Sequence, residues 1–365
     1  MRMSMYVISE SEVARTINAI TADKFMDALI DNIEKGFRMF DAAGAQLSAR
    51  AGFTSGRNLI EWMPVHDGES NVTLKLVSYF PDNPVNHQTP TIDAVIVTFD
   101  FQTGKPKAVA GGALLTAMRT GAASAVASRI LAKPDSRVLG LIGCGAQAVT
   151  QAHALSRIFK FEEILIHDTD PYAEETINER LAFLGIKISP ANVQEIEKRS
   201  DIICTATTNP VGSAPVLSGE NLKRDVHINA VGADFPGKTE LPGTLVKTAF
   251  VVTDFYEQAK VEGECQVFSG ETPGADVCIE LKDLTVAREN YYGHQNRQTI
   301  FDSTGVALED AIAVDLLCDI AKKYAIGKVL GDATTTCALD PYSELLITSD
   351  CVMRSATRQR METLS

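Results

Sequence analysis

Residues 137–148 read RVLGLIGCGAQA, and this stretch decides the fold. The run VLGLI is apolar without alternation, which is typical of a strand buried on both faces of a parallel sheet. It leads into Gly143, Gly145 and Ala148, the GxGxxA pattern of a dinucleotide-binding strand-turn-helix unit. The first glycine permits the tight turn, the second lets backbone N–H groups approach a diphosphate, and the alanine lets helix and strand pack closely. We therefore expect a dinucleotide at Gly143, Gly145, Ala146 and Gln147.

The next apolar run, EILIH, ends beside two acidic residues. Asp168 stands twenty positions after Ala148, where an acidic side chain accepts a hydrogen bond from the ribose 2′-hydroxyl and repels the 2′-phosphate of NADP. The predicted cofactor is therefore NAD. Asp170 is the alternative residue for the ribose contact.

Apolar runs continue to alternate with amphipathic stretches, which predicts an α/β fold with a Rossmann-type, doubly wound parallel sheet. The segment before this pattern differs, because a helical stretch at 23–40 is followed by strand-like pieces and by a hairpin signal, FDFQTGKPKAV at 99–109. It predicts a second domain of the α+β type. The further apolar runs of the parallel sheet are DIICTAT at 201–207, VHINAVG at 226–232, AFVVTD at 249–254 and QTIFDS at 298–303.

These patterns predict how the chain is divided. A Rossmann domain at 126–309 is expected to be inserted between the α+β segment at 1–125 and a returning helical segment at about 310–345. The last residues, 346–365, are polar and are predicted to form a flexible tail.

Composition and charge exclude several classes of protein. The 365 residues carry 34 Lys and Arg against 47 Asp and Glu, so the net charge of −13 offers no basic surface to nucleic acid. No apolar stretch approaches the roughly 20 residues of a membrane span, and the first residues lack the apolar core of a signal peptide. A cytoplasmic protein is expected. No His pair has HxxxH spacing and no Cys pair has CxxC spacing, so no metal site is predicted.

Three basic residues stand in apolar or small surroundings: Arg50 in LSARAGF, Lys75 in VTLKLVS and Arg119 in LTAMRTGAAS. Such charges are seldom buried unless they are paired, and a small carboxylate substrate is one natural partner. A structural ion pair or a snorkelling side chain is the other explanation for each of them.

The loop ADFPGKTE at 233–240 leaves the carboxyl end of a predicted parallel strand, which is where open α/β sheets bind ligands. Asp234 and Lys238 are therefore expected to face a nicotinamide, and Asp234 is the best candidate for acid/base chemistry. Its alternative role is an Asx turn or a helix cap. Glu61 in LIEWMP is a further acid, in strand-like apolar surroundings.

These stretches occur in an order that resembles the ornithine cyclodeaminase and mu-crystallin family. The resemblance covers about residues 50–315 and looks closest to the cyclodeaminase branch. MRTGAASAVASRILA, GAQAVTQAHALS and the late ALDPY look more like lysine than ornithine cyclodeaminases. The motifs that carry the resemblance are IEWMP, LTAMRTGAASAVASRILA, LIGCGAQA, HDTDP, HINAVGADFPGKTEL, EGECQ and FDSTGVALED.

The resemblance implies a homodimer formed through the α+β domain, which also binds the substrate. It implies an NAD-dependent conversion of L-lysine to L-pipecolate, or of L-ornithine to L-proline, with release of ammonia. Hydride leaves the substrate Cα for NAD, the terminal amine attacks that carbon, ammonia leaves and the hydride returns.

The resemblance also assigns roles by position. Arg50, Lys75 and Arg119 would hold the α-carboxylate, while Glu61 and Asp234 would bind the side-chain amine, which Asp234 deprotonates. The residues implied around the nicotinamide are Thr91, Thr207, Val231, Lys238 and Ser303.

Two alternatives remain open. An NAD(P)-dependent amino-acid dehydrogenase or cyclic ketimine reductase would consume its cofactor stoichiometrically, and Glu61 together with the acid of ADFPGKTE argues against it. A non-catalytic ligand-binding protein of the mu-crystallin type would not need an acid at Asp234. The sequence does not separate lysine from ornithine, because one methylene changes binding by only about 1–3 kcal/mol.

Overall fold

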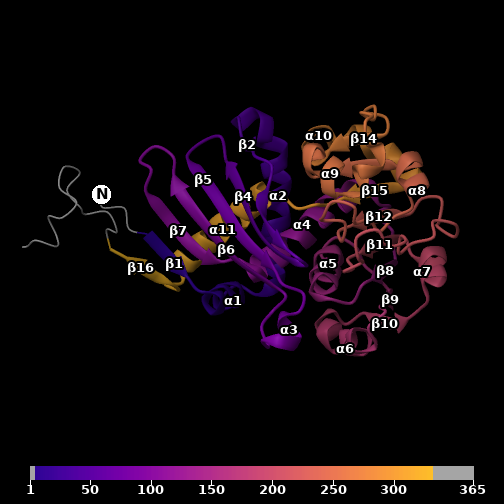
Figure 1. Cartoon of the computed structure of the whole chain (residues 1–365), viewed down its shortest axis with the longest axis horizontal. Helices are drawn as coiled ribbons and strands as arrows, with labels where there is room; N and C mark the ends of the chain where they lie inside the picture. Colours follow the sequence, from indigo (N-terminus) through magenta and orange to yellow (C-terminus); the bar gives the residue numbers. More distant parts are fainter. Residues whose placement is uncertain (1–4, 332–365) are drawn as a thin grey trace, which may run out of the picture.

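The chain folds around two β-sheets that lie side by side (Figure 1), and the computed structural model describes residues 5–331. One sheet is parallel throughout and the other is mostly antiparallel, which confirms the predicted pairing of a Rossmann-type sheet with an α+β part. The predicted tail at 346–365 lies outside the described residues, and the domain boundaries stay a prediction. No helix within 5–331 is long and apolar enough to cross a membrane.

The parallel sheet has the spatial order β10-β9-β8-β11-β12-β15-β13-β14. Its first strand in the chain, β8, lies between β9 and β11, so the sheet grows first to one side and then to the other. The carboxyl ends of β8 and β11 therefore form the switch point at which open α/β sheets bind ligands. The strands are β8 (Val138–Ile142), β9 (Glu163–His167), β10 (Lys187–Pro190), β11 (Ile202–Thr205), β12 (His227–Ala230), β13 (Phe250–Thr253), β14 (Cys278–Glu280) and β15 (Thr299–Asp302).

Helices connect most of these strands, since parallel neighbours require crossover connections, and β11 and β12 are joined by residues 206–226 without a helix. Helix α5 follows β8 directly and begins at the glycine turn. The α-helices of this part are α5 (Ala146–Ser156), α6 (Pro171–Leu181), α7 (Val193–Arg199), α8 (Gly243–Thr248), α9 (Tyr256–Glu262) and α10 (Leu281–Val286). Three 3-10 helices are η1 (Ala182–Leu184), η2 (Glu264–Phe268) and η3 (Arg288–Asn296).

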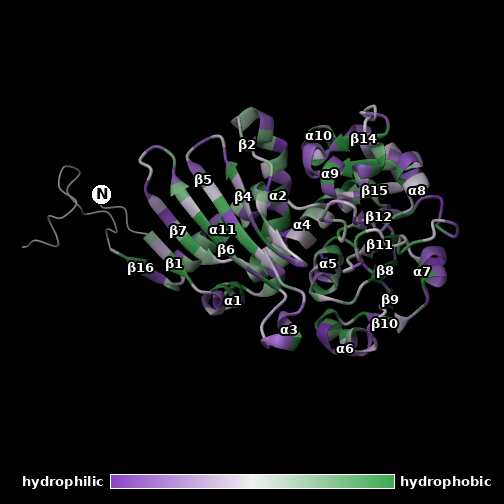
Figure 2. Ribbon diagram, viewed as in Figure 1, coloured by the Kyte–Doolittle hydropathy of each residue, from purple (hydrophilic) through white to green (hydrophobic). Residues whose placement is uncertain are grey.

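The second sheet has the order β16-β1-β7-β6-β5-β4-β2, and β3 pairs with β4. Side chains alternate between the two faces of a strand, so Glu61 shares a face with Met63, which lies opposite Lys75 on the neighbouring strand. Hydrophobic residues run along β5, β6 and β7 (Figure 2). The strands are β1 (Met5–Ile8), β2 (Gln46–Leu47), β3 (Ala51–Ser55), β4 (Asn58–His66), β5 (Asn71–Tyr79), β6 (Ile92–Asp100), β7 (Pro106–Gly111) and β16 (Lys328–Leu330).

One helix, α4, joins the two halves and carries a predicted site residue, Arg119. It is buried along most of its length, and its small residues let α5 approach closely. A Cβ built on Gly121 of α4 would lie 2.5 Å from the carbonyl oxygen of Thr150 on α5. The remaining helices of this half are α1 (Glu10–Asn18), α2 (Ala22–Ala43), α3 (Asn83–Asn86), α4 (Ala113–Leu131) and α11 (Ala307–Lys323).

Candidate active site

Two of the predicted cations, Lys75 and Arg119, meet on one carboxylate. Lys75 Nζ lies 2.8 Å from Oδ2 of Asp310, and Arg119 Nε donates to Oδ1 of the same residue at 3.0 Å. Arg119 also pairs with Glu309, and none of the four side chains is more than 5% exposed. The two acids lie in the first turn of α11. The sequence analysis did not single them out, although they end the motif FDSTGVALED.

Burial controls the charges of this group. Burial, followed by the charge of Arg119, lowers the pKa of Lys75 to about 8. Burial also raises the pKa of Glu309 to about 7. For Arg119, burial acts to lower the pKa of the guanidinium, but the nearby negative charges of Asp310 and Glu309 outweigh burial and raise this pKa. The sequence analysis offered a structural ion pair as the alternative explanation for Lys75 and Arg119, and the structure contains such pairs. Their shared partner, Asp310, holds the two cations close together.

Arg50, the third predicted cation, lies on the connection between β2 and β3. Its guanidinium donates to the carbonyl oxygens of Thr304 and Gly305, the latter at 3.0 Å. The same guanidinium lies 2.8 Å from Oε1 of Glu262 and 3.3 Å from Oε2 of Glu61. Arg50 therefore connects two acids to the turn that follows β15.

This turn, residues 303–305, brings Arg50 next to Arg119. A Cβ built on Gly305, whose φ is +79°, would lie 2.5 Å from Nη1 of Arg119, so only glycine fits here. Asp254, at the end of β13, holds the turn by accepting from the Gly305 N–H at 2.5 Å and from the Thr304 hydroxyl at 2.9 Å. The hydroxyl of Ser303, predicted at the nicotinamide, lies 3.5 Å from the same carboxylate. The structure thus brings Arg50, Lys75 and Arg119 together around one turn.

Three acids gather on the other side of Arg50. Burial raises the pKa of Glu61, and it raises the pKa of Glu262 to about 7. Asp234 is near enough to raise both values further. Asp234 itself is half exposed and pairs with Lys238 at 2.9 Å. The structure therefore places the predicted acids Glu61 and Asp234 in one group and adds Glu262, which the sequence analysis did not assign.

The motif EGECQ braces the loop that carries Asp234 and Lys238. The side-chain amide of Gln266 accepts from the N–H of Gly237 at 2.6 Å and donates to the carbonyl of Lys238 at 3.1 Å. Glu262 begins the same motif and contacts Arg50. This short segment thus joins the predicted carboxylate-binding group to the acid-bearing loop.

The buried carboxylate of Glu240 organises the ends of β11 and β12. It accepts from the N–H and the hydroxyl of Thr207, at 2.7 and 2.6 Å, and from the N–H of Gly232 at 2.8 Å. The hydroxyl of Thr207, predicted at the nicotinamide, is therefore held at the carboxyl edge of the sheet. Val231, also predicted there, is buried directly after β12.

The glycine turn has the geometry that the sequence predicts. Gly143 has φ +92°, and a Cβ on it would lie 2.4 Å from the carbonyl oxygen of Ala206, at the switch point. A Cβ on Gly145 would meet nothing within 4 Å, so the backbone is open to a ligand there. No side chain caps the start of α5. The N–H groups at Ala146 and Gln147 therefore fit a diphosphate.

The two acids after β9 have different contacts. Asp168 lies at the glycine turn, where Oδ2 accepts from the N–H of Cys144 at 2.6 Å. Asp170 caps α6 by accepting from the N–H of Tyr172 at 3.0 Å. These contacts favour Asp168 for the ribose and explain Asp170 by its structural role.

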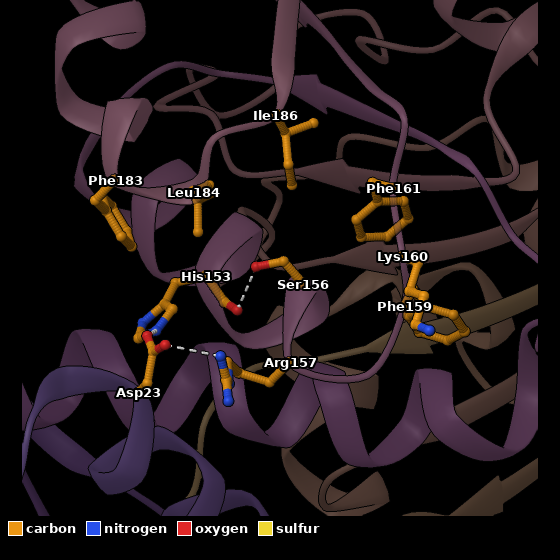
Figure 3. Close-up of a pocket in the computed structure, with 10 residues that line it drawn as sticks. All are labelled: Asp23, His153, Ser156, Arg157, Phe159, Lys160, Phe161, Phe183, Leu184 and Ile186. Carbon is orange, nitrogen blue, oxygen red and sulfur yellow. Dashed lines mark hydrogen bonds and ion pairs between the residues drawn. The ribbon is translucent and has the colours of Figure 1, made fainter.

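Two further features lie apart from this site: Thr91, and the cavity that Figure 3 shows. Among residues 5–331, neither Thr91 nor the residues that line the cavity form a hydrogen bond with the site residues described above. Thr91 lies between α3 and β6, and its carbonyl accepts from the N–H of Phe80 at 2.8 Å. The cavity lies at the other end of α5, where His153 and Arg157 both contact Asp23 of α2, at 3.0 and 2.8 Å. It is thus separate from the glycine turn, and the role predicted for Thr91 stays a prediction.

Known proteins resemble this chain along most of its length. A family model described as the ornithine cyclodeaminase/mu-crystallin family matches residues 10–324. An L-lysine cyclodeaminase of Streptomyces rapamycinicus is 39% identical over 346 residues, which are 93% of this chain and 100% of that protein.

Two solved structures extend the comparison. A lysine cyclodeaminase, studied for its recognition of L-lysine, L-ornithine and L-2,4-diaminobutyric acid, superposes with a TM-score of 0.88 at 41% identity, covering 93% of this chain and 99% of that one. An archaeal alanine dehydrogenase dimer with bound NAD superposes with a TM-score of 0.81 at 30% identity, covering 90% of this chain and 100% of that one.

Proposed function

The chain belongs to the ornithine cyclodeaminase/mu-crystallin family, and from this premise we propose that it is an NAD-dependent ammonia-lyase acting on a basic L-amino acid. The proposed reactions are L-lysine to L-pipecolate, or L-ornithine to L-proline, each with release of ammonia. One observation carries the proposal: Arg50 lies between a group of cations and a group of acids. One side therefore suits a carboxylate and the other side suits amines.

The carboxylate side consists of Lys75, Arg119 and Arg50. Among residues 5–331, Lys75 and Arg119 pair with Glu309 and Asp310, and Arg50 pairs with Glu61 and Glu262. Burial raises the pKa of Glu309 and of Glu262 to about 7, so part of this negative charge is neutralised by protons at neutral pH and a substrate carboxylate can pair with the three cations. The planar fork of an arginine suits this contact, because it can donate two parallel hydrogen bonds to the two oxygens.

The amine side consists of Glu61, Glu262 and Asp234, with Lys238 as a cation in contact with Asp234. A second ammonium group on the substrate is complementary to these acids. In the proposed reaction Asp234 takes the proton from the terminal amine, which must be uncharged before it attacks Cα. Holding this amine and Cα in one pocket adds the advantage of proximity.

NAD fits the switch point of the parallel sheet. The open backbone at Gly145 and the N–H groups at Ala146 and Gln147 would hold its diphosphate, and Asp168 its ribose. When bound, NAD would supply a reversible hydride acceptor for the substrate Cα. The protein supplies orientation and the proton acceptors.

The decisive experiment incubates the protein with a catalytic amount of NAD⁺ and with L-lysine, L-ornithine or L-alanine, and follows ammonia, cyclic product and NADH together. We expect many turnovers of ammonia and cyclic product from a diamino acid without accumulation of NADH. Substrate deuterated at Cα should give product that keeps the label, because the same hydride returns.

A second candidate function is an amino-acid dehydrogenase, since the alanine dehydrogenase dimer shares the fold at 30% identity. Stoichiometric NADH, or loss of the deuterium to solvent, would establish that function instead. A protein that binds amino acids and NAD⁺ without producing ammonia or NADH would be a ligand-binding protein.

The proposed assembly is a homodimer in the cytoplasm, formed through the antiparallel sheet. The face of this sheet opposite Lys75 exposes large apolar side chains, with Phe53 76%, Ile60 43% and Phe99 38% exposed. Large apolar side chains exposed on one face are a feature of protein interfaces. Sedimentation should give twice the monomer mass, and Phe53→Glu should shift the equilibrium toward the monomer.

A further inference from the structure

A proton count of the proposed cyclodeamination, on which this inference rests, shows that the site needs two proton acceptors. At neutral pH both amines of L-lysine are protonated. The α-amine must lose a proton before hydride can leave Cα, and the terminal amine must lose one before it can attack. Hydride departure leaves an iminium at Cα, to which the terminal nitrogen adds.

The second half of the cycle returns both protons. A proton moves from the ring nitrogen to the original α-amine, the bond from Cα to that nitrogen breaks, and ammonia leaves a cyclic iminium. The returning hydride converts this iminium to the cyclic amine. One stored proton then goes to ammonia and the other to the ring nitrogen, so the charge of L-lysine equals that of pipecolate plus ammonium.

Asp234 accounts for one acceptor, and we propose that Glu262 is the second and takes the proton of the α-amine. Glu262 is the last residue of α9, and Oε1 lies 2.8 Å from Nε of Arg50. Arg50 is the cation proposed for the substrate carboxylate. Because the carboxylate and the α-amine are both attached to Cα, an acid in contact with Arg50, as Glu262 and Glu61 both are, lies within reach of the α-amine.

The hydrogen bonds of Glu262 are incomplete. Its side chain is 8% exposed, yet among residues 5–331 neither its Oε1 nor Nε of Arg50 has a properly directed hydrogen bond, despite their short separation. Oε1 of Glu262 is therefore held by the charge of Arg50 but remains able to accept a directed hydrogen bond from a ligand. Glu61 differs, because its Oε2 accepts a hydrogen bond from Arg50 Nη1 at 3.3 Å.

The charges around Glu262 suit a group that gains and loses a proton. The groups that face it are Arg50, Glu61, Asp234 and Asp254. Burial raises the pKa of Glu262 to about 7, the three acids add to this effect, and Arg50 opposes it. A proton acceptor is most effective when its pKa lies near the working pH.

Two half-reactions test the assignment with the whole protein. The first is formation of NADH from L-lysine and NAD⁺ in a single turnover, which needs the α-amine deprotonated. The second is reduction of the cyclic imine of lysine, Δ1-piperideine-2-carboxylate, by NADH, which needs no such step. Glu262→Gln should slow the first at least about 10²-fold and the second no more than a few-fold. Glu262→Asp, which keeps an acceptor, should recover part of the first.

Glu257→Gln is the matched control, because Glu257 lies on the same helix, is exposed and pairs only with Lys260 among the described residues. It should leave both half-reactions within about twofold of the wild type. In the wild type, the rate of NADH formation should fall as the pH drops below about 7, because protonated Glu262 cannot accept a proton. In Glu262→Gln this decrease at low pH should be absent.

Each other outcome overturns the assignment. NADH formation at the wild-type rate in folded Glu262→Gln would show that another group takes the proton. Equal slowing of both half-reactions would show a structural role. The proposed function fails separately: wild-type protein that accumulates stoichiometric NADH from L-lysine and forms no cyclic amine is not a cyclodeaminase, and the Glu262 comparison still reports on the hydride step.

Discussion

The cofactor end and the substrate end of this site are built in different ways. The cofactor end is one short stretch, the glycine turn at residues 143–147, in which the backbone itself would bind the dinucleotide. The substrate end draws side chains from the β2–β3 connection, β4, β5, α4, α9, α11 and the loop after β12. A backbone motif depends on its own neighbours in the sequence, whereas a group of buried charges depends on the whole fold. The two ends should therefore respond differently to substitution.

The largest effect is expected for Arg119→Leu. This change leaves Glu309 buried without its cation and Asp310 with Lys75 alone, and breaking a buried ion pair typically costs about 3–5 kcal/mol of unfolding free energy. Turnover should be lost as well. Arg57→Leu is the control, because Arg57 pairs with Asp82 on the surface and should cost less than about 1 kcal/mol. Urea denaturation measures both, and equal costs would contradict the buried pairing.

Asp234→Asn should affect chemistry rather than stability, because Asp234 is half exposed on its loop. Steady-state ammonia release should fall about 10²-fold or more, since the amide cannot accept the proton of the terminal amine. NAD⁺ affinity should stay within a few-fold. NADH should accumulate in a single turnover, because hydride leaves while ring closure fails. Unchanged turnover would mean that Asp234 only pairs with Lys238.

The same contrast explains what the sequence could predict. The parallel sheet and the glycine turn follow from short-range patterns, and the structure contains both. Asp168 lies beside this turn, and its contact with the ribose stays a prediction. Local patterns single out Arg50, Lys75 and Arg119 only as charges in apolar surroundings, and it is the family resemblance that groups them. Their meeting point depends on the turn at 303–305 and on Asp310, and no local pattern shows which buried acid a distant cation will contact.

Glu262 and Glu240 show the limit more clearly. Glu262 is one of many acids in a chain with 47 of them, and only the fold shows that it is buried beside Arg50. Glu240 ends a motif that the sequence analysis recognised, but its contacts to Thr207 and Gly232 join two separate strands. Each of the two acids lies in a motif that the sequence analysis quoted, EGECQ for Glu262 and ADFPGKTE for Glu240. Membership of these motifs is the signal that could have identified both residues as making contacts with distant parts of the chain.

At the cofactor end, Asp168→Arg should reverse the choice of dinucleotide. The wild type should bind NAD⁺ at least about tenfold more tightly than NADP⁺, because a carboxylate at the turn repels the 2′-phosphate. The variant should favour NADP⁺. Titration calorimetry measures the affinity for each dinucleotide, and equal affinities of the wild type for NAD⁺ and NADP⁺ would contradict the assignment of Asp168 to the ribose. Lysine turnover with saturating cofactor should change little, since the substrate pocket is untouched.

The substrate end should depend on pH through Lys75. Its pKa of about 8 means that it is charged below this pH and loses its charge above it. Inhibition by a monocarboxylate without amines should therefore weaken by up to about tenfold per pH unit above pH 8. Using such a probe keeps the titration of substrate amines out of the measurement. Flat inhibition up to pH 10 would show that Lys75 stays charged or does not bind the carboxylate.

The smallest effect is expected for Asp170→Ala, which tests whether the two acids after β9 really have separate roles. Asp170 caps α6 through the N–H of Tyr172, and loss of such a cap costs about 1 kcal/mol. Asn192→Ala, which removes the equivalent cap of α7, should cost a similar amount. Neither change should alter NAD⁺ affinity more than a few-fold, because Asp168 stays at the glycine turn. If Asp170→Ala instead weakened NAD⁺ binding tenfold while stability held, the ribose would contact Asp170. Asp168 would then serve only to hold the backbone N–H groups of Cys144 and Asp170, and the cofactor end would depend on a helix cap rather than on the turn itself.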